Sequence, residues 1–328
     1  MKKILICGGG GFIGHHLAKK LKDSKDFILV VDIKPENEFC EDETYCDEYV
    51  QADLRKQDTW GMLKDRFGKF DIIYQLAADM GGAGYIFTGD HDAAVMSNSA
   101  SININCVEYA ILWGAKVFYS SSACIYPKHN QTDPDNPKLS EDSAYPAFPD
   151  SEYGWEKLFS ERLYKAAERN HNLEVRIARF HNIFGPEGTF RGGKEKAPAA
   201  LCRKVADAQK GEIEVWGPGN QTRSFLYIDE CLEAMERLMD SDFTDPLNIG
   251  SEEMISINDL AQMVIEISTK KVTVTNVDGP IGVMGRNSDN TLIREVLQWS
   301  PSLPLLSGMK KTYDWVLQEC NAPITSII

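Results

Sequence analysis

Tyr153 and Lys157 are a pair of residues whose types and spacing could support chemistry. They are four residues apart at the start of a helix-like segment, 151–169, so both side chains should project from one helix face. A lysine ammonium beside a phenol stabilises the phenolate and lowers its pKa from about 10 toward neutral pH. Such a phenolate can take the proton of a hydroxyl group while a hydride leaves the same carbon. The pair predicts redox chemistry at an alcohol, although this spacing alone is common by chance.

A hydroxyl and a thiol precede this pair in the chain. Ser122 and Cys124 follow the apolar run 117–119, and the serine could hydrogen-bond the reacting oxygen. The chain has eight cysteines in 328 residues, too few for a disulfide framework, and most lie in apolar surroundings typical of buried small side chains. Cys40 and Cys46 have no second Cys or His pair nearby, so we expect no metal site.

A glycine-rich turn follows the first expected strand, 3–7. Gly8, Gly11 and Gly14 fit a G-x-x-G-x-x-G pattern between this strand and an amphipathic helix that ends near residue 21. The first glycine allows the tight turn, the second lets the backbone approach a pyrophosphate, and the third lets the helix pack on the strand. The alternative is a flexible strand–helix loop, which the next strand makes less favoured.

A second expected strand, 27–31, ends in Asp32, about 20 residues beyond the glycines. A carboxylate there accepts hydrogen bonds from an adenine-ribose 2′-hydroxyl and repels a 2′-phosphate, which favours NAD over NADP despite the nearby Lys34. Asp53 lies in a segment, 51–55, that we expect to open another helix. Its carboxylate could contact the adenine edge or simply cap that helix, and both possibilities stay open.

Further buried strands are expected at 71–76 and 117–119, each with a helical segment after it, and a short strand is expected at 224–228. Strands that alternate with helices predict an α/β fold with a Rossmann-type, doubly wound parallel sheet. Ligands bind such sheets beyond the carboxyl ends of the strands. Ala77, Ala78 and Gly81 follow one of these ends, and their small size would let a ligand approach closely.

The second half of the chain places isolated cations in glycine-rich segments. Fixed guanidinium and ammonium groups that face a cleft bind a diphosphate well, although any single one could be surface charge. We expect a dinucleotide-binding domain at 1–180, to which 224–250 returns, and a smaller α/β substrate-binding lobe at 181–223 and 251–328. The cations are Arg191, Lys194, Lys196, Lys204, Arg223 and Arg286.

The composition excludes several classes of protein. With 43% hydrophobic and 26% charged residues, the chain is typical of a globular protein. A net charge of −14 disfavours nucleic-acid binding, which requires a basic face. No apolar stretch approaches the roughly 18 residues of a membrane span, and the run 4–6 is too short for a signal peptide. We therefore expect a soluble, cytoplasmic protein that binds neither nucleic acid nor membrane.

Taken together, the glycine turn, Ser122 and the Tyr153–Lys157 pair resemble the extended short-chain dehydrogenase/reductase family of nucleotide-sugar enzymes. Within it, the chain is most similar to the GDP-mannose 3,5-epimerase family. This resemblance covers nearly the whole chain, and its motifs are highly specific in combination. It is carried by segments 77–82, 121–127, 179–183, 195–200, 221–225 and 285–290.

The resemblance implies a mechanism. Tyr153, with Lys157 beside it and NAD as hydride acceptor, would oxidise C4 of a GDP-hexose and so make the C–H bonds at C3 and C5 acidic. Cys124 would remove a proton as base, Lys196 would return one from the opposite face, and Tyr153 and Ser122 would hold the enolate. Re-reduction at C4 would leave tightly bound NAD recycled. The implied reaction converts GDP-D-mannose to GDP-L-galactose, with GDP-L-gulose as a possible second product.

The resemblance also implies binding residues, a homodimer through the helices near 91–113 and 151–169, and no metal. The residues implied for NAD are Gly8, Gly11, Phe12, Ile13, Gly14, Asp32, Asp53, Leu76, Ala77, Ala78, Tyr153 and Lys157. Those implied for the nucleotide sugar are Gly81, Ser122, Cys124, Asn182, Glu195, Lys196, Lys204, Gln221, Arg223 and Arg286.

Two other interpretations stay open. A GDP-sugar C4 dehydrogenase, a 4-epimerase or a GDP-fucose-synthase-like reductase would keep oxidation at C4 without the double epimerisation. A non-catalytic protein that binds NAD or a nucleotide sugar is the second interpretation. Binding alone needs none of Tyr153, Lys157, Cys124 and Lys196, so their joint presence argues for an enzyme.

Overall fold

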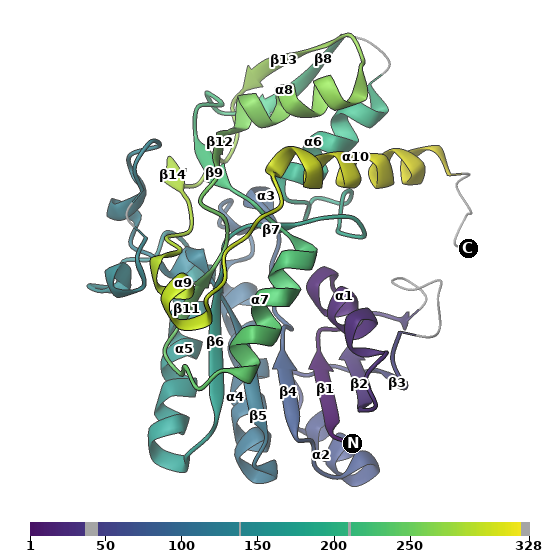
Figure 1. Ribbon diagram of the computed structural model, residues 1–328, viewed down its shortest axis with the longest axis vertical. Helices are drawn as coiled ribbons and strands as arrows, with labels where there is room; N and C mark the ends of the chain where they lie inside the picture. Colours follow the sequence, from purple (N-terminus) through teal and green to yellow (C-terminus); the bar gives the residue numbers. More distant parts are fainter. Residues whose placement is uncertain (37–44, 138, 209–210, 323–328) are drawn as a thin grey trace.

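The computed structural model describes residues 1–36, 45–137, 139–208 and 211–322. A large sheet with flanking helices forms one region, and smaller sheets with three helices form a second region above it (Figure 1). Cys40 lies outside the described residues.

Seven parallel strands form the large sheet, in the order β11-β6-β5-β4-β1-β2-β3. The chain moves outward from β1 to one side and later from β4 to the other, which confirms the doubly wound arrangement. The switch point between β1 and β4 is where such sheets bind ligands, beyond the strands' carboxyl ends. The strands are β1 (Lys3–Cys7), β2 (Phe27–Asp32), β3 (Glu48–Gln51), β4 (Ile72–Gln75), β5 (Lys116–Ser122), β6 (Val175–Phe180) and β11 (Leu247–Ile249).

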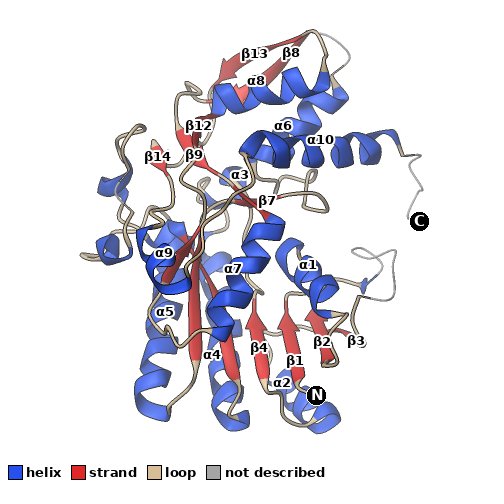
Figure 2. Cartoon of the chain, viewed as in Figure 1, coloured by secondary structure: helices blue, strands red, loops and turns tan. Residues whose placement is uncertain are grey.

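Helices cover both faces of this sheet (Figure 2). Successive residues of a strand point to opposite faces, so β1 contributes Ile4 and Ile6 to one core and Leu5 and Cys7 to the other. Burial on both faces explains why the strands read as continuous apolar runs. The first core holds α1 (Phe12–Leu21) and α7 (Ile228–Asp240); the second holds α2 (Gln57–Phe67), α4 (Asp92–Trp113) and α5 (Glu152–His171).

The second region contains three small sheets. One core cluster continues from α1 and α7 into the helices of this region, so the two regions share apolar packing. The sheets pair β13 (Val272–Val277) with β8 (Gly211–Trp216), β10 (Leu226–Tyr227) with β7 (Ile183–Phe184), and β12 (Met254–Ser256) and β14 (Gly285–Arg286) with the central β9 (Thr222–Ser224). The helices are α6 (Ala197–Asp207), α8 (Ile257–Ser268) and α10 (Leu305–Asn321), and the short α3 (Ala83–Ile86) and α9 (Thr291–Leu297) lie nearer the large sheet.

Two expectations about elements are wrong. A single strand at 224–228 does not form: β9 ends at Ser224, β10 takes 226–227, and Ile228 begins α7. In α7 the apolar residues recur at helical spacing and are buried against the sheet. The helix expected from residue 51 begins only at Gln57, because Gln51 pairs with Asp32 as the last residue of β3.

None of the helices within the described ranges is long and apolar enough to cross a membrane.

Candidate active site

The glycine turn is packed too tightly for side chains. Gly8 has φ +82°, and a Cβ there would lie 2.7 Å from backbone atoms of Ala77. A Cβ on Gly14 would lie 2.4 Å from the carbonyl oxygen of Gly8. No side chain caps the N-terminus of α1, whose N-cap residue is Gly11, so its first N–H groups are available to an anion. These features fit the pyrophosphate of a dinucleotide, with Phe12 and Ile13 at the start of the helix.

Asp32 stands at the end of β2 with its carboxylate held in place. The Gly10 N–H donates to Oδ2 at 3.0 Å, and the Lys34 N–H donates to Oδ1 at 3.1 Å. Both bonds come from backbone N–H groups. This position beside the glycine turn fits recognition of a ribose hydroxyl.

Asp53 is bound to the Arg55 side chain through two bonds. Nε donates to Oδ1 and Nη2 donates to Oδ2, each at 2.8 Å, and these bonds to Arg55 lower the pKa of the Asp53 carboxyl. The same guanidinium reaches Asn98 of α4 at 2.8 Å. Lys56, not Asp53, is the N-cap residue of α2, so the capping alternative is wrong. Contact with adenine stays a prediction.

The turn after β4 brings a distant loop to the sheet. Leu76, Ala77 and Ala78 follow the strand, and the Gly82 N–H donates to the carbonyl oxygen of Lys194 at 3.0 Å. A Cβ on Gly82 would lie 2.1 Å from the carbonyl oxygen of residue 195. Only a glycine lets the loop dock this closely, and the docking places the 194–196 segment over the carboxyl end of the sheet.

Helix α5 carries Tyr153 and Lys157 to the end of β5. The Lys157 Nζ donates to the carbonyl oxygen of Ser120 at 2.8 Å and lies 5.7 Å from the centroid of the Tyr153 ring. Ser151 caps the helix, since its Oγ accepts from the Gly154 N–H at 3.3 Å. A Cβ on Gly154 would lie 2.1 Å from the carbonyl oxygen of Cys124. This turn of α5 therefore packs directly on the thiol segment, residues 122–126.

The expectation that Lys157 lowers the pKa of Tyr153 is wrong for the structure. Burial raises that pKa well above its ordinary value, and Cys124 adds to the rise. A hydrogen bond with Ser122 opposes it. The Lys157 ammonium donates its hydrogen bond to a backbone carbonyl, and burial lowers the pKa of this ammonium. The Tyr153 side chain is therefore a protonated phenol at neutral pH, which can donate a hydrogen bond, and not a permanent phenolate.

Cys124 lies in a short 3₁₀ turn, Ala123–Ile125, that follows β5. Its N–H donates to the Ser122 Oγ at 3.2 Å, and the sulfur is nearly buried. The Arg286 Nη1 donates to Sγ at 3.0 Å. The same guanidinium donates from Nε to Gln131 Oε1 at 2.6 Å and from Nη2 to Asp150 Oδ2. The thiol thus faces a fixed positive charge.

Sequence reasoning missed Asp150 and Gln131. Asp150 lies in a segment rich in Pro and Asp, and only its place directly before the helix-capping Ser151 could have drawn notice. Gln131 lies in a short turn with no motif around it. Their partner Arg286 is more than 130 residues away in sequence, as the separations of 136 and 155 show.

Lys196 is half-buried at the N-terminus of α6, where it is the N-cap residue. Burial lowers the pKa of its ammonium, and Cys124 and Cys231 oppose the shift. The docking of the 194–196 segment on Gly82 places this amine at the same end of the sheet as Cys124, although 72 positions separate them. A buried ammonium with a lowered pKa is a stronger proton donor than an exposed lysine.

Arg223 donates only to backbone carbonyls, those of Thr222 at 2.6 Å, Ile281 at 2.9 Å and Val283 at 2.7 Å. No carboxylate within the described ranges forms an ion pair with it. Burial, with the neighbouring Arg286, lowers the pKa of Arg223 to about 9. A guanidinium buried without an acidic partner is suited to an anionic ligand.

Lys204 and Gln221 form a second group around Trp216. The Lys204 Nζ donates to the carbonyl oxygen of Glu214 at 2.6 Å and lies 5.8 Å from the centroid of the indole. The Gln221 Nε2 donates to the Trp216 carbonyl oxygen at 3.0 Å. Its Oε1 is buried without a hydrogen-bond partner, so an acceptor is left for a ligand N–H or O–H.

The remaining expected substrate residues have mainly intramolecular partners. Asn182, at φ +46°, donates from Nδ2 to the Ser224 carbonyl oxygen at 2.9 Å. Glu195 accepts from the Gly193 N–H at 2.6 Å and pairs with Arg203 at 3.5 Å. Gly81 packs on Tyr85, since a Cβ would lie 2.7 Å from that side chain. Their contact with a ligand stays a prediction.

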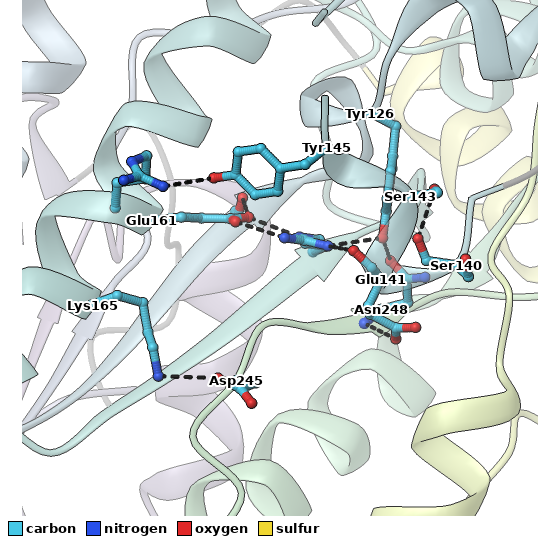
Figure 3. A network of polar contacts seen from close by, with 12 residues as sticks. Tyr126, Ser140, Glu141, Ser143, Tyr145, Glu161, Lys165, Asp245 and Asn248 are labelled. Carbon is cyan, nitrogen blue, oxygen red and sulfur yellow. Dashed lines mark hydrogen bonds and ion pairs between the residues drawn. The ribbon is translucent and has the colours of Figure 1, made fainter. Parts of the chain in front are cut away.

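A buried polar network that includes Tyr126 anchors the thiol segment (Figure 3). Arg179 of β6 donates to both carboxylate oxygens of Glu161 at 3.0 and 2.9 Å, and to the Tyr126 hydroxyl at 3.2 Å. Tyr126, two residues after Cys124, donates to Asn248 Oδ1 of β11 at 2.6 Å. The network thus fixes the thiol segment to α5 and to two strands of the large sheet.

The parallel sheet, the glycine turn and the Tyr153–Lys157 pair define a dinucleotide-dependent enzyme of the short-chain dehydrogenase/reductase type. Residues 4–250 match the model of the NAD dependent epimerase/dehydratase family. GDP-mannose 3,5-epimerase of Arabidopsis thaliana is 46% identical over 318 residues, which cover 97% of this chain and 82% of that protein. The chain belongs to the NAD dependent epimerase/dehydratase family and is an NAD-dependent nucleotide-sugar epimerase.

Solved structures agree with this assignment. UDP-glucuronic acid 4-epimerase from Bacillus cereus, in complex with UDP-glucuronic acid and NAD, superposes with a TM-score of 0.82 at 25% identity and covers 97% of this chain and 99% of its own. UDP-glucose 4-epimerase from Thermotoga maritima has the same fold, with a TM-score of 0.84 at 22% identity and coverage of 97% and 99%. The family resemblance and the cofactor predicted from the sequence are confirmed.

Proposed function

We propose that this enzyme epimerises GDP-D-mannose at C5 and C3 to give GDP-L-galactose, with GDP-L-gulose as the product of inversion at C5 alone. The observation that carries the proposal is that the Cys124 thiol, in contact with Arg286, packs against the first turn of the Tyr153 helix while the 194–196 segment docks over the same end of the sheet. Epimerisation at C4 alone needs only the redox pair, whereas inversion at a neighbouring carbon needs a base and an acid on opposite faces. The 46% identity to the Arabidopsis GDP-mannose 3,5-epimerase supports the same substrate.

Tyr153 and Ser122 act on the oxygen at C4. NAD would be held by the glycine turn and by Asp32, and it would supply the hydride acceptor and later the hydride donor for this carbon. Tyr153 accepts the C4 hydroxyl proton as a phenolate, which forms when the buried phenol releases its own proton to solvent, and Ser122, which hydrogen-bonds the phenol, shares the charge. Lys157 stays fixed on the Ser120 carbonyl, 5.7 Å from the centroid of the Tyr153 ring, and holds this turn of α5 against the end of β5.

Cys124 and Lys196 then exchange protons with the ketone. The Cys124 thiolate, beside Arg286, takes the proton of C5, and the electron pair of that C–H bond moves into an enolate that Tyr153 and Ser122 stabilise. The Lys196 ammonium returns a proton to C5 from the other face and becomes the amine. Both groups recover their starting protonation by exchange with solvent before the same sequence at C3.

The second region binds the nucleotide part in this proposal. Arg223, buried without a carboxylate partner, suits the diphosphate, and Lys204 with Gln221 suits the base. Asn182 lies between β6 and β7, and Glu195 lies in the loop before α6. The division into a cofactor domain at 1–180, with 224–250, and a nucleotide-sugar lobe at 181–223 and 251–328 follows this allocation of roles.

We also propose a homodimer through α4 and α5. Ile104 and Leu112 of α4 are 50% and 59% exposed, and Trp155 and Phe159 of α5 are 40% and 48% exposed. Trp155 and Phe159 are one helical turn apart and share a face. Large apolar side chains spaced along two adjacent helices are typical of an interface. Light scattering should give twice the monomer mass, and F159E should give the monomer.

Product analysis tests the proposed substrate and reaction. We expect incubation with GDP-D-mannose to yield GDP-L-galactose, identified by NMR, without added NAD if the cofactor remains bound. Parallel incubations with UDP-glucose and UDP-glucuronic acid should leave those sugars unchanged. Turnover of a UDP-sugar with no change in GDP-mannose would contradict the proposal, as would inversion of GDP-mannose at C4 only.

A further inference from the structure

The Arg286 guanidinium has one partner on each of its three nitrogens. Nη1 donates to the Cys124 sulfur, Nε to Gln131 and Nη2 to Asp150, and the side chains of the arginine and Asp150 are 7% and 2% exposed. Because the guanidinium is planar and rigid, these three bonds fix both its position and its rotation. The direction in which Nη1 meets the thiol is therefore set by the other two partners.

Asp150 is the partner that balances the charge. A buried guanidinium without an anion is strongly destabilised, and neither Gln131 nor a protonated Cys124 carries a negative charge. Burial by itself would lower the pKa of Arg286, and the proximity of Cys124 and Asp150 raises it instead. Whenever the thiol is protonated, Asp150 is the anion that keeps Arg286 charged and in place.

Asp150 also connects this charge to the redox helix. Its Oδ1 accepts from the Ser151 hydroxyl at 3.1 Å, and Ser151 is the N-cap residue of α5. One carboxylate thus contacts Arg286 with one oxygen and the first turn of the helix that carries Tyr153 with the other. Asp150 therefore contacts both the arginine that faces the thiol and the N-cap residue of the helix that carries Tyr153.

We propose that Asp150 is a positioning residue for proton transfer by Cys124, which holds Arg286 against the sulfur while leaving the C4 redox step intact. This inference rests on the proposed function, since it assigns Asp150 to exchange at C3 and C5. Asp150 does not touch the thiol and acts through Arg286.

Several elements bring charged groups toward the thiol. Positive groups come from β14, β9, the loop before α6, and α5, and the phenol of α5 faces the thiol as well. Asp150 is the acidic side chain that hydrogen-bonds Arg286. The groups are Arg286, Arg223, Lys196, Lys157, Tyr153 and Asp150.

The test compares D150A, D150N and wild type with GDP-mannose in deuterium oxide. D150A leaves the guanidinium without its anion, so we expect exchange at C5 to fall about tenfold or more, the loss typical of a charge-assisted hydrogen bond. Single-turnover NADH formation should stay within about twofold, because Ser151 still caps the Tyr153 helix through its own bond with the Gly154 N–H. D150N keeps an oxygen acceptor for Nη2 but loses the negative charge, so its exchange should fall by less than that of D150A.

E152Q is the matched control, because Glu152 lies two residues further along in the first turn of α5 and shares no recorded hydrogen bond or ion pair with Arg286. We expect wild-type exchange and wild-type NADH formation. An equal loss of NADH formation and exchange in D150A would show a merely structural role and overturn the proposal, as would wild-type exchange in D150A. If D150A does not fold, wild-type exchange in D150N overturns it. Absence of exchange in the wild type itself would instead refute the proposed function.

Discussion

Replacing Lys196 by methionine should separate proton removal from inversion. Methionine keeps the apolar stem of the half-buried side chain and removes the ammonium that returns the proton. Cys124 and its Arg286 contact are unchanged, so the thiol can still take the C5 proton and return a deuteron to the same face. In deuterium oxide we therefore expect GDP-mannose that gains deuterium at C5 while its configuration is retained.

The size of the effect follows from the role of Lys196. A positioned general acid contributes about 100- to 10,000-fold, and burial, which lowers the pKa of this ammonium, makes it a stronger donor than a surface lysine. Formation of GDP-galactose by K196M should fall by a factor in this range, whereas exchange at C5 should fall far less. Arg203, two turns further along α6 and paired with Glu195, offers the matched control: R203M removes a cation from the same helix without removing the acid.

NMR of the recovered sugar nucleotide measures both quantities in one sample. The deuterium content at C5 reports proton removal, and the ratio of the two epimers reports inversion. Loss of exchange and inversion in equal proportion would refute the assignment of base and acid to opposite faces. Full inversion by K196M would refute the role of Lys196 altogether.

Three further predictions concern other parts of the site. C124A should abolish exchange at C3 and C5 and leave partial NAD reduction in single turnover; full epimerisation would refute the assignment of the base. G14A should remove co-purifying NAD and lower stability by about 1–3 kcal/mol, because its Cβ would meet the Gly8 carbonyl oxygen at 2.4 Å; unchanged NAD content would contradict the packing argument. E161Q should lower the free energy of unfolding, measured in urea, by about 3–5 kcal/mol, because Arg179 would lose its anion in the core. The control E233Q breaks an exposed pair with Arg237 and should lower it by under about 1 kcal/mol. Equal losses in the two variants would argue against the network.

Local sequence pattern predicted the large sheet well. Continuous apolar runs such as 3–7 and 27–31 are what a strand buried on both faces requires, and the glycine turn between strand and helix has a direct steric reason. Prediction failed at 224–228, where two short strands and the first turn of α7 follow one another. Apolar residues in so short a segment fit a strand or a helix equally well, and packing against the sheet decides between them.

The site was predictable only where a motif is local. Tyr153 and Lys157 share one helix turn, so their proximity follows from spacing. The contact of Arg286 with Cys124 spans 162 positions and depends on how β14 lies beside β9, which no local pattern encodes. The raised pKa of Tyr153 could not be foreseen either, since it arises from burial that only the folded chain produces.

The most direct test of the central claim follows deuterium and NADH together while the wild-type enzyme acts on GDP-mannose in deuterium oxide. The account predicts deuterium at both C5 and C3 of the product, with the NADH absorbance returning to its starting level once turnover ends. Accumulation of NADH in proportion to the substrate consumed would identify a C4 dehydrogenase. Inversion at C4 without deuterium at C3 or C5 would identify a 4-epimerase, and either result would contradict the account.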